Sequence, residues 1–257
     1  MEDKDLHNAH VIVLEADGKV DSQHGYGYLI AKRLTEFKIN AALVSIVENA
    51  QILETLPPKP LILSGGMTEV TADIDWIVKT KAFFRERIKF NQEVEKKNRL
   101  PTFGICFGAQ LLVESYSKGS VKYLDDPEIG ITDVPLKVPS HPIFQGYEKQ
   151  FKGYTFHYNQ IKTQKVSVLS SHVHKGHHFI QAFEIPDSSC FGVQFHPELN
   201  YEEMKTLLHT YKDLIKNLGL DVDPIIRTLP KIPANSVILK NFCTLPGSIK
   251  KRLDSTH

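Results

Sequence analysis

Apolar segments of strand length alternate with amphipathic segments along the first half of the chain. Residues 11–14, 41–46 and 61–64 form mainly apolar runs, a pattern typical of strands buried on both faces of a sheet. Between them, apolar positions recur at helical spacing over residues 28–37 and again over about residues 73–90. Strands separated by amphipathic helices predict an α/β fold with a doubly wound, mostly parallel sheet flanked by helices.

The pattern changes in the second half of the chain. Between residues 128 and 184 three segments, 129–138, 166–171 and 179–185, alternate with period two, which predicts a small antiparallel extension of the sheet. Further on, one apolar stripe at helical spacing predicts a single helix that ends at Gly219; its members are Met204, Leu207, Leu208, Tyr211, Leu214, Ile215 and Leu218. We find no internal repeat or long linker, so we expect one domain over residues 1–257, with a C-terminal helical extension from about residue 219.

Composition narrows the classes of function. Thirty-one Lys and Arg residues nearly balance 30 Asp and Glu residues, which gives no electrostatic case for nucleic acid or an acidic membrane as partner. No apolar stretch approaches the roughly 20 residues that a spanning helix needs, and the charged N-terminus lacks the apolar core of a signal peptide. The chain has three widely separated cysteines, which favours a reducing, cytoplasmic environment.

Cys106 lies in the segment with the strongest chemical signal. The apolar run over residues 100–105 meets Gly104-x-Cys106-x-Gly108 and then a helical pattern, the arrangement of a nucleophile elbow with cysteine in place of serine. Such a turn places the sulfur near a helix N-terminus, whose positive dipole end favours the reactive thiolate. Taken alone, these five residues fit equally well a buried cysteine between two glycines.

A second segment strengthens the catalytic interpretation. An apolar run over residues 190–195 ends in His196-Pro197-Glu198, and two residues spaced by two in an extended chain emerge on the same side. A cysteine nucleophile needs a nearby base, and an imidazole needs an acceptor that fixes its tautomer. His196 and Glu198 supply both roles.

A third segment, Ser64-Gly65-Gly66, follows the buried run over residues 61–63. Backbone N–H groups at such a turn can point at a ligand oxygen, and Phe107, the residue after the nucleophile, supplies another donor. Together they would form an oxyanion hole, in which one donor is worth roughly 3 kcal/mol.

These three segments, in this order, resemble the class I (triad) glutamine amidotransferase domain, and the resemblance covers most of the chain. Glu128-Ile-Gly130, His141-Pro-Ile-Phe144 and Phe156-His-Tyr-Asn159 are similar to further segments of that family. The resemblance implies a flavodoxin-like fold and hydrolysis of a γ-glutamyl amide: the cysteine attacks, ammonia leaves, and water releases glutamate from the thioester. It implies no cofactor and no metal.

The resemblance also implies a role for each matching residue. Cys106 corresponds to the nucleophile, His196 to the general base and acid, and Glu198 to the residue that orients the histidine. The backbone N–H groups of Gly66 and Phe107 correspond to the oxyanion hole. The positions implied for substrate binding are Gly65, Gln110, His157 and Asn159.

Some positions depart from the family pattern on the substrate side. Met67-Thr68-Glu69 stands where the family usually has Pro-x-Ser, and Phe156 and Asn159 replace the usual Ser and Asp around His157. Four histidines lie within residues 171–178; histidine-rich tracts can bind metal, but these flank Lys175-Gly176 and indicate a solvated hairpin turn instead.

Three hypotheses of function remain. The leading one is a free-standing γ-glutamyl hydrolase, since a helical insertion before the segment 236–242 is similar to free-standing members such as plant γ-glutamyl peptidases. The alternative is the glutaminase subunit of a two-chain amidotransferase that delivers ammonia to a separate synthetase. The third, a regulatory module that binds a γ-glutamyl ligand without turnover, fits the intact Cys106, His196 and Glu198 least.

Overall fold

A computed structural model describes residues 3–174 and 176–246. Lys175 of the predicted hairpin turn lies outside the described residues, as do residues 247–257 of the predicted C-terminal extension. Within the described part of the chain, no helix combines the length and apolar character needed to cross a membrane.

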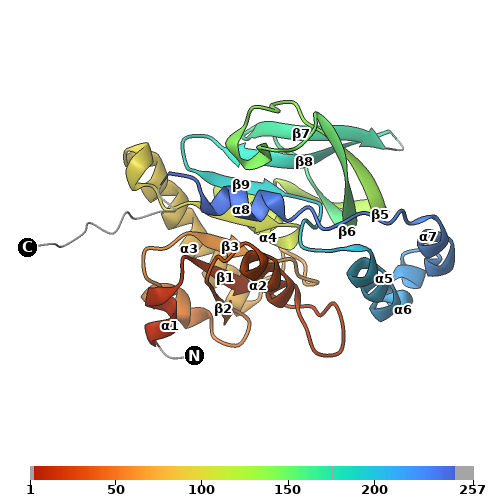
Figure 1. Cartoon of the computed structure of the whole chain (residues 1–257), viewed down its shortest axis with the longest axis horizontal. Helices are drawn as coiled ribbons and strands as arrows, with labels where there is room; N and C mark the ends of the chain where they lie inside the picture. The colour runs from red at the N-terminus through yellow and green to blue at the C-terminus, as the bar shows by residue number, and fades with distance from the viewer. Residues whose placement is uncertain (1–2, 175, 247–257) are drawn as a thin grey trace, which may run out of the picture.

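The main sheet has seven strands in the order β2-β1-β3-β4-β9-β8-β7 (Figure 1). The five strands from β2 to β9 are parallel, and β8 and β7 add antiparallel pairings at one edge. This confirms the predicted α/β fold. The strands are β1 Val11–Glu15, β2 Ala41–Ser45, β3 Leu61–Leu63, β4 Thr102–Ile105, β7 Ser167–His174, β8 His177–Ile185 and β9 Cys190–Val193.

Helices cover both faces of this sheet. Ile12 and Leu14 of β1 belong to one buried apolar cluster, together with residues of α3 and α4, whereas Val11 and Val13 belong to another with residues of α2 and α8. This alternation explains why the run is apolar throughout, because side chains of a strand point to its two faces in turn. The helices are α1 Asp3–Asn8, α2 Tyr26–Glu36, α3 Asp75–Glu93, α4 Phe107–Tyr116, α5 Tyr201–Thr210, α6 Lys212–Asn217, α7 Val222–Thr228 and α8 Val237–Cys243, with short 3-10 turns at Ala50–Thr55, Lys96–Asn98 and Pro142–Phe144.

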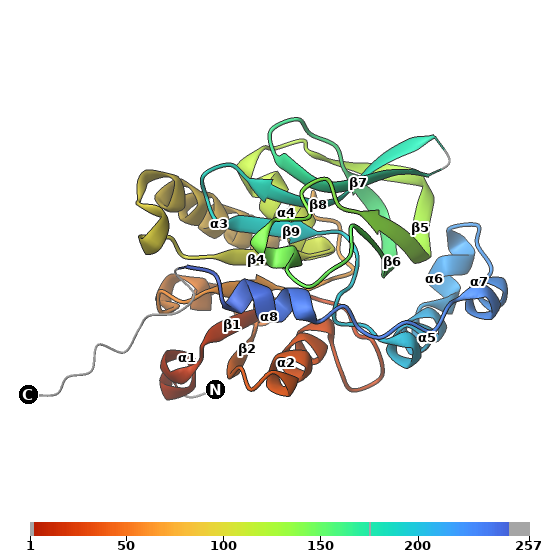
Figure 2. The ribbon, with the colours of Figure 1, turned by 45° about the horizontal axis from the view of Figure 1, so that its top comes forward.

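A second, two-stranded antiparallel sheet pairs β5 (Val121–Pro135) with β6 (Gln150–Ile161). Helices α5, α6 and α7 group together beside it at one end of the molecule (Figure 2). The predicted antiparallel extension is therefore confirmed, and it consists of this sheet together with the β7–β8 hairpin.

Two details differ from the sequence predictions. The segment with the apolar stripe is two helices, because the backbone leaves helical geometry at Tyr211, with φ −106° and ψ 25°. The Tyr211 hydroxyl accepts a hydrogen bond from the backbone N–H of Lys19 at 2.9 Å, and its ring lies 5.6 Å from that of Phe156, so a tertiary contact fixes this break. The pattern also did not predict β6 as a strand. Gly219, with φ +80°, ends α6 as expected.

Candidate active site

Cys106 occupies a sharp turn between β4 and α4. Its backbone has φ +49° and ψ −106°, in the half of conformational space that non-glycine residues rarely enter. A Cβ at Gly104 would lie 2.5 Å from the carbonyl carbon of Gly108, and a Cβ at Gly108 would lie 2.3 Å from the carbonyl oxygen of Leu63. The strand and the helix therefore approach closely enough that both positions require glycine, as the sequence predicted.

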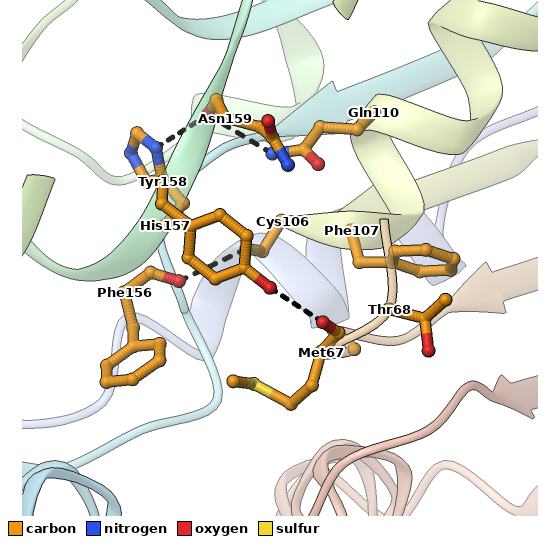
Figure 3. Close-up of a pocket in the computed structure, with 10 residues that line it drawn as sticks. Met67, Thr68, Cys106, Phe107, Gln110, Phe156, His157, Tyr158 and Asn159 are labelled. Atoms are coloured by element: carbon orange, nitrogen blue, oxygen red, sulfur yellow. Dashed lines mark hydrogen bonds between the residues drawn. The ribbon is translucent and has the colours of Figure 1, made fainter. Parts of the chain in front are cut away.

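The Cys106 sulfur has polar neighbours on two sides. The carbonyl oxygen of Phe156, on β6, lies 3.6 Å from it, and the side-chain nitrogen of Gln194 also lies 3.6 Å from it. Figure 3 shows Cys106 between Phe156 and Phe107, behind the ring of Tyr158. The residue is only 4% exposed, and it directly precedes the first residue of α4, where the helix dipole favours a negative charge.

His196 follows β9 and is held on several sides. Its Nδ1 lies 2.8 Å from Oε1 of Glu198, and its backbone N–H donates to the carbonyl of Tyr154. The Tyr26 ring stacks on the imidazole with the centroids 5.1 Å apart, and a Cβ at Gly65 would lie 3.0 Å from His196 Cε1. Gly65 therefore packs against His196, and its lack of a side chain makes room for the imidazole.

The electrostatics of His196 favour its protonated form. Burial acts to lower the pKa of His196, but the Glu198 carboxylate and the nearby Cys106 sulfur outweigh burial and raise this pKa to about 10. Its Nε2 is buried and makes no hydrogen bond to any residue in the described ranges. An imidazolium with one free N–H beside a cysteine sulfur stabilises a thiolate.

Gly66 and Phe107 lie next to each other at the carboxyl ends of β3 and β4. A Cβ at Gly66 would lie 3.1 Å from Cγ of Phe107, and the N–H of Phe107 belongs to the first turn of α4, where backbone donors lack intrahelical partners. The Asp17 carboxylate holds the loop after Gly66, since it accepts hydrogen bonds from the backbone of Met67 and from both the backbone and the hydroxyl of Thr68. Two backbone donors can therefore converge beside the sulfur.

A small pocket opens at these residues (Figure 3). Six of the residues expected at the site line it, while Gly65, His196 and Glu198 lie outside its lining. The lining residues are Gly66, Met67, Thr68, Cys106, Phe107, Gln110, Phe156, His157, Tyr158 and Asn159.

His157 contributes to the pocket wall, but its ring points away from Cys106 (Figure 3). Its Nδ1 lies 2.8 Å from the carbonyl oxygen of Asn159 and its Nε2 lies 2.8 Å from Oε2 of Glu128. Both partners are hydrogen-bond acceptors, so the two contacts hold the ring from both of its nitrogens. This geometry favours the role of ordering the strand that carries Asn159.

Glu128 is a buried carboxylate that the sequence did not single out by its side chain. It also accepts hydrogen bonds from Thr132 and Gln181, and its Oε1 lies 2.8 Å from Nε2 of His172. The expectation that the histidine tract is a solvated turn is therefore wrong for His172, which pairs with Glu128 because β7 faces β5.

Within the described ranges, no group of three or more His, Cys, Asp or Glu residues could hold a metal ion.

Other contacts at the site could not be predicted from the sequence. The Tyr158 hydroxyl donates to the carbonyl of Met67 at 2.7 Å, and the Asn159 amide donates to the Glu69 carboxylate at 2.8 Å. Both bonds join β6 to the loop after β3, residues that lie about ninety positions apart. Gln194 lies inside a segment that the sequence did single out, two residues before His196, yet only the fold brings its amide to the sulfur.

Comparison with known proteins gives a consistent result. The family model of class-I glutamine amidotransferases matches residues 19–212. The glutamine-hydrolysing GMP synthase of Helicobacter pylori is 28% identical over 241 residues, which cover 90% of this chain and 43% of that protein. One subunit of the glutamine-hydrolysing GMP synthase of Sulfolobus acidocaldarius is 27% identical over 193 residues, which cover 74% of this chain and 92% of that subunit. The chain thus spans less than half of the Helicobacter enzyme but nearly the whole of the Sulfolobus subunit.

Solved structures share the fold. A glutamine amidotransferase from Thermotoga maritima superposes with a TM-score of 0.63 at 19% identity, covering 91% of this chain and 96% of the other. A glutamine amidotransferase from Methylobacillus flagellatus superposes with a TM-score of 0.64 at 16% identity, covering 96% of this chain and 98% of the other.

Proposed function

Because the chain belongs to the class-I glutamine amidotransferase family, we propose that it hydrolyses the γ-glutamyl amide of glutamine or a related γ-glutamyl compound through a Cys106 thioester. The observation that carries this proposal is the arrangement around Cys106. The sulfur projects from a strained turn at a helix N-terminus, beside an imidazole whose Nδ1 lies 2.8 Å from the Glu198 carboxylate.

The geometry supports a simple sequence of steps. The Cys106 thiolate attacks the γ-carbonyl carbon, and the backbone N–H groups of Gly66 and Phe107 receive the developing oxyanion. The C–N bond then breaks as His196 gives its proton to the leaving nitrogen, which leaves a thioester. His196 next takes a proton from water, the resulting hydroxide attacks the thioester, and glutamate and the thiolate are released.

Substrate binding belongs to the far end of the pocket. Gln110 lies one turn into α4, and its amide donates to the carbonyl of Asn159 at 3.3 Å. We propose that Gln110 and Asn159 contact the substrate there, while His157 holds the strand that presents Asn159. Gly65 acts through His196 in this scheme.

A second function is favoured by one specific observation. The Sulfolobus relative, which the chain matches over 92% of its length, is by its name one subunit of a larger enzyme. The chain could accordingly act as a glutaminase subunit that supplies ammonia to a separate synthetase, and the same chemistry at Cys106 would serve both roles.

Glutamate release by the purified chain tests the proposal. Glutamine and, separately, γ-glutamyl peptides such as glutathione are supplied, with Cys106→Ser as the inactive variant, because a hydroxyl is a far weaker nucleophile than a thiolate. Cys190→Ala is the matched control, since Cys190 is a buried cysteine on β9, away from the turn. Release that survives Cys106→Ser in full would overturn the assignment. Release that appears only after a synthetase is added would favour the second function.

A further inference from the structure

Gln194 is a buried amide that the fold places next to the nucleophile. Ile105 of β4 pairs in parallel register with Val193 of β9, and the carbonyl of Val193 accepts the backbone N–H of Cys106 at 2.8 Å. Cys106 and Gln194 therefore emerge together where these two strands end. Gln194 is 1% exposed, and its backbone N–H donates to Gln181 on β8 at 2.9 Å.

Neighbouring amides fix which end of the Gln194 side chain faces the sulfur. The Gln110 amide nitrogen, which donates to the carbonyl of Asn159, lies 3.4 Å from Oε1 of Gln194. Because that nitrogen can only donate, the oxygen of Gln194 must face it. The NH₂ group of Gln194 is then the end that lies 3.6 Å from Sγ of Cys106.

The two polar neighbours of the sulfur favour different protonation states. The Phe156 carbonyl, 3.6 Å away, can accept a hydrogen bond from a thiol, but it cannot donate one to a thiolate. The Gln194 N–H donates to the sulfur, and this bond strengthens when the sulfur becomes an anion. The titratable groups that face the sulfur are His196, Tyr26 and Tyr158. Burial raises the pKa of both tyrosines, so the tyrosines stay neutral and His196 supplies the positive charge.

We propose that Gln194 is a further catalytic residue, whose side-chain N–H donates a hydrogen bond to the Cys106 thiolate and holds the sulfur in position for attack. The imidazolium of His196 provides charge from one side, and Gln194 provides a fixed neutral donor from another. When the sulfur forms a thioester it loses its charge, and the bond from Gln194 weakens. Only the expected effect of Gln194 on turnover rests on the proposed function; the hydrogen bond to the sulfur does not.

Replacement of the amide by an apolar side chain of similar length tests the role. In Gln194→Met we expect alkylation of Cys106 by iodoacetamide at neutral pH to slow about tenfold, the size of effect expected from one hydrogen bond to a charged group. The ultraviolet absorbance of the thiolate should fall in parallel. In turnover assays kcat should fall while KM for glutamine stays close to that of the unmodified protein.

Gln181→Met is the matched control. Gln181 is also buried, but its amide donates to Glu128, so alkylation of Cys106 should keep its rate. If Gln194→Met does not fold, Gln194→Asn serves instead, because its amide is one methylene too short to reach the sulfur and the same losses are expected.

The outcomes separate this role from the proposed function. A folded Gln194 variant with unchanged alkylation and unchanged thiolate absorbance overturns the role of Gln194, whatever its turnover. Slower alkylation and weaker absorbance support it even if the unmodified chain releases no glutamate, since neither measurement involves a substrate. In that case the proposed function fails and the thiolate contact stands.

Discussion

His196 is oriented by contacts with its ring, and one neighbouring carboxylate favours its protonated form. Tyr26 and the backbone at Gly65 confine the ring, while Glu198 contacts Nδ1. The carboxylate of Glu198 is fully buried, so its attraction for the imidazolium is weakly screened. The loop that carries Glu198 is fixed in turn by Arg33, whose Nε donates to the Glu198 carbonyl at 3.0 Å.

We predict that Glu198→Gln lowers kcat for glutamate release by about 10²- to 10⁴-fold, because the amide keeps the size of the side chain but loses the charge that raises the pKa of His196. Steady-state kinetics with glutamine check this. Glu202→Gln is the control, an exposed carboxylate in the first turn of α5, and it should retain activity. Equal rates for the two variants would remove Glu198 from the mechanism.

At the scale of elements, one buried carboxylate joins the two sheets. Glu128 on β5 contacts His157 on β6, His172 on β7 and Gln181 on β8. Burial acts to raise the pKa of Glu128, but the bonds from the two histidines outweigh burial and hold this pKa well below its usual range. The folded protein therefore binds fewer protons at this group than the unfolded chain does, so stability rises with pH through this range.

The contribution of Glu128 to stability should be fully present above about pH 4.5, the ordinary value for a glutamate, and should be lost as the pH falls. We predict that Glu128→Gln is less stable at neutral pH by about 3 kcal/mol, since it leaves several buried hydrogen-bond donors without their charged acceptor. Its free energy of unfolding should fall less steeply on acidification. Urea unfolding across the acid range measures both effects, with Glu95→Gln on the surface as control. Parallel pH curves for the variant and the unmodified protein would contradict this account.

The turn at Cys106 is the other element whose packing can be tested. A Cβ added in Gly108→Ala would meet the carbonyl oxygen of Leu63 at 2.3 Å, so α4 must shift, at a cost of about 1–3 kcal/mol. We predict a lower unfolding midpoint together with a large loss of glutamate release, because the shift moves Cys106. Gly119→Ala, just beyond the other end of α4, has open space around its Cβ and only backbone strain. It should keep activity, and a comparable loss of activity there would argue against a local effect.

Most of the fold could be predicted from the spacing of apolar residues along the chain. A strand that is buried on both faces is apolar throughout, as from Val11 to Leu14, whereas a helix that is buried on one face has apolar residues at helical spacing. The sharp turn at Cys106 and the pairing of His196 with Glu198 were predictable as well, since turns and short extended segments place such groups within a few residues. Contacts between distant segments were not predictable. The pairing of Glu128 with His172 and the approach of Gln194 to Cys106 depend on strand register, and the break at Tyr211 depends on Lys19 and Phe156.

At the scale of the whole molecule, the pocket lies where the main sheet meets the small one. Gly66, Cys106 and His196 follow the carboxyl ends of β3, β4 and β9, the edge where ligands bind in open α/β sheets, and residues of β6 line the opposite wall. The bond from Tyr158 to Met67 joins β6 to the loop after β3 across the pocket (Figure 3), and the bond from Asn159 to Glu69 joins the same two segments. Three of the four residues that these two bonds join, Met67, Tyr158 and Asn159, line the pocket at Cys106.

We predict that Tyr158→Phe speeds alkylation of Cys106 by a bulky maleimide about fivefold, because one hydrogen bond of about 1 kcal/mol no longer holds the wall to the loop. Tyr123→Phe is the matched control, since its ring lies 6.3 Å from that of Tyr158 but is 59% exposed. Unchanged alkylation in Tyr158→Phe would show that access to the sulfur is not limited by this bond. A parallel rise in glutamate release by the isolated chain would show that closure limits turnover, as expected of a subunit that opens only when its synthetase is bound. Faster alkylation without faster release would instead favour a self-sufficient hydrolase limited by its chemical step.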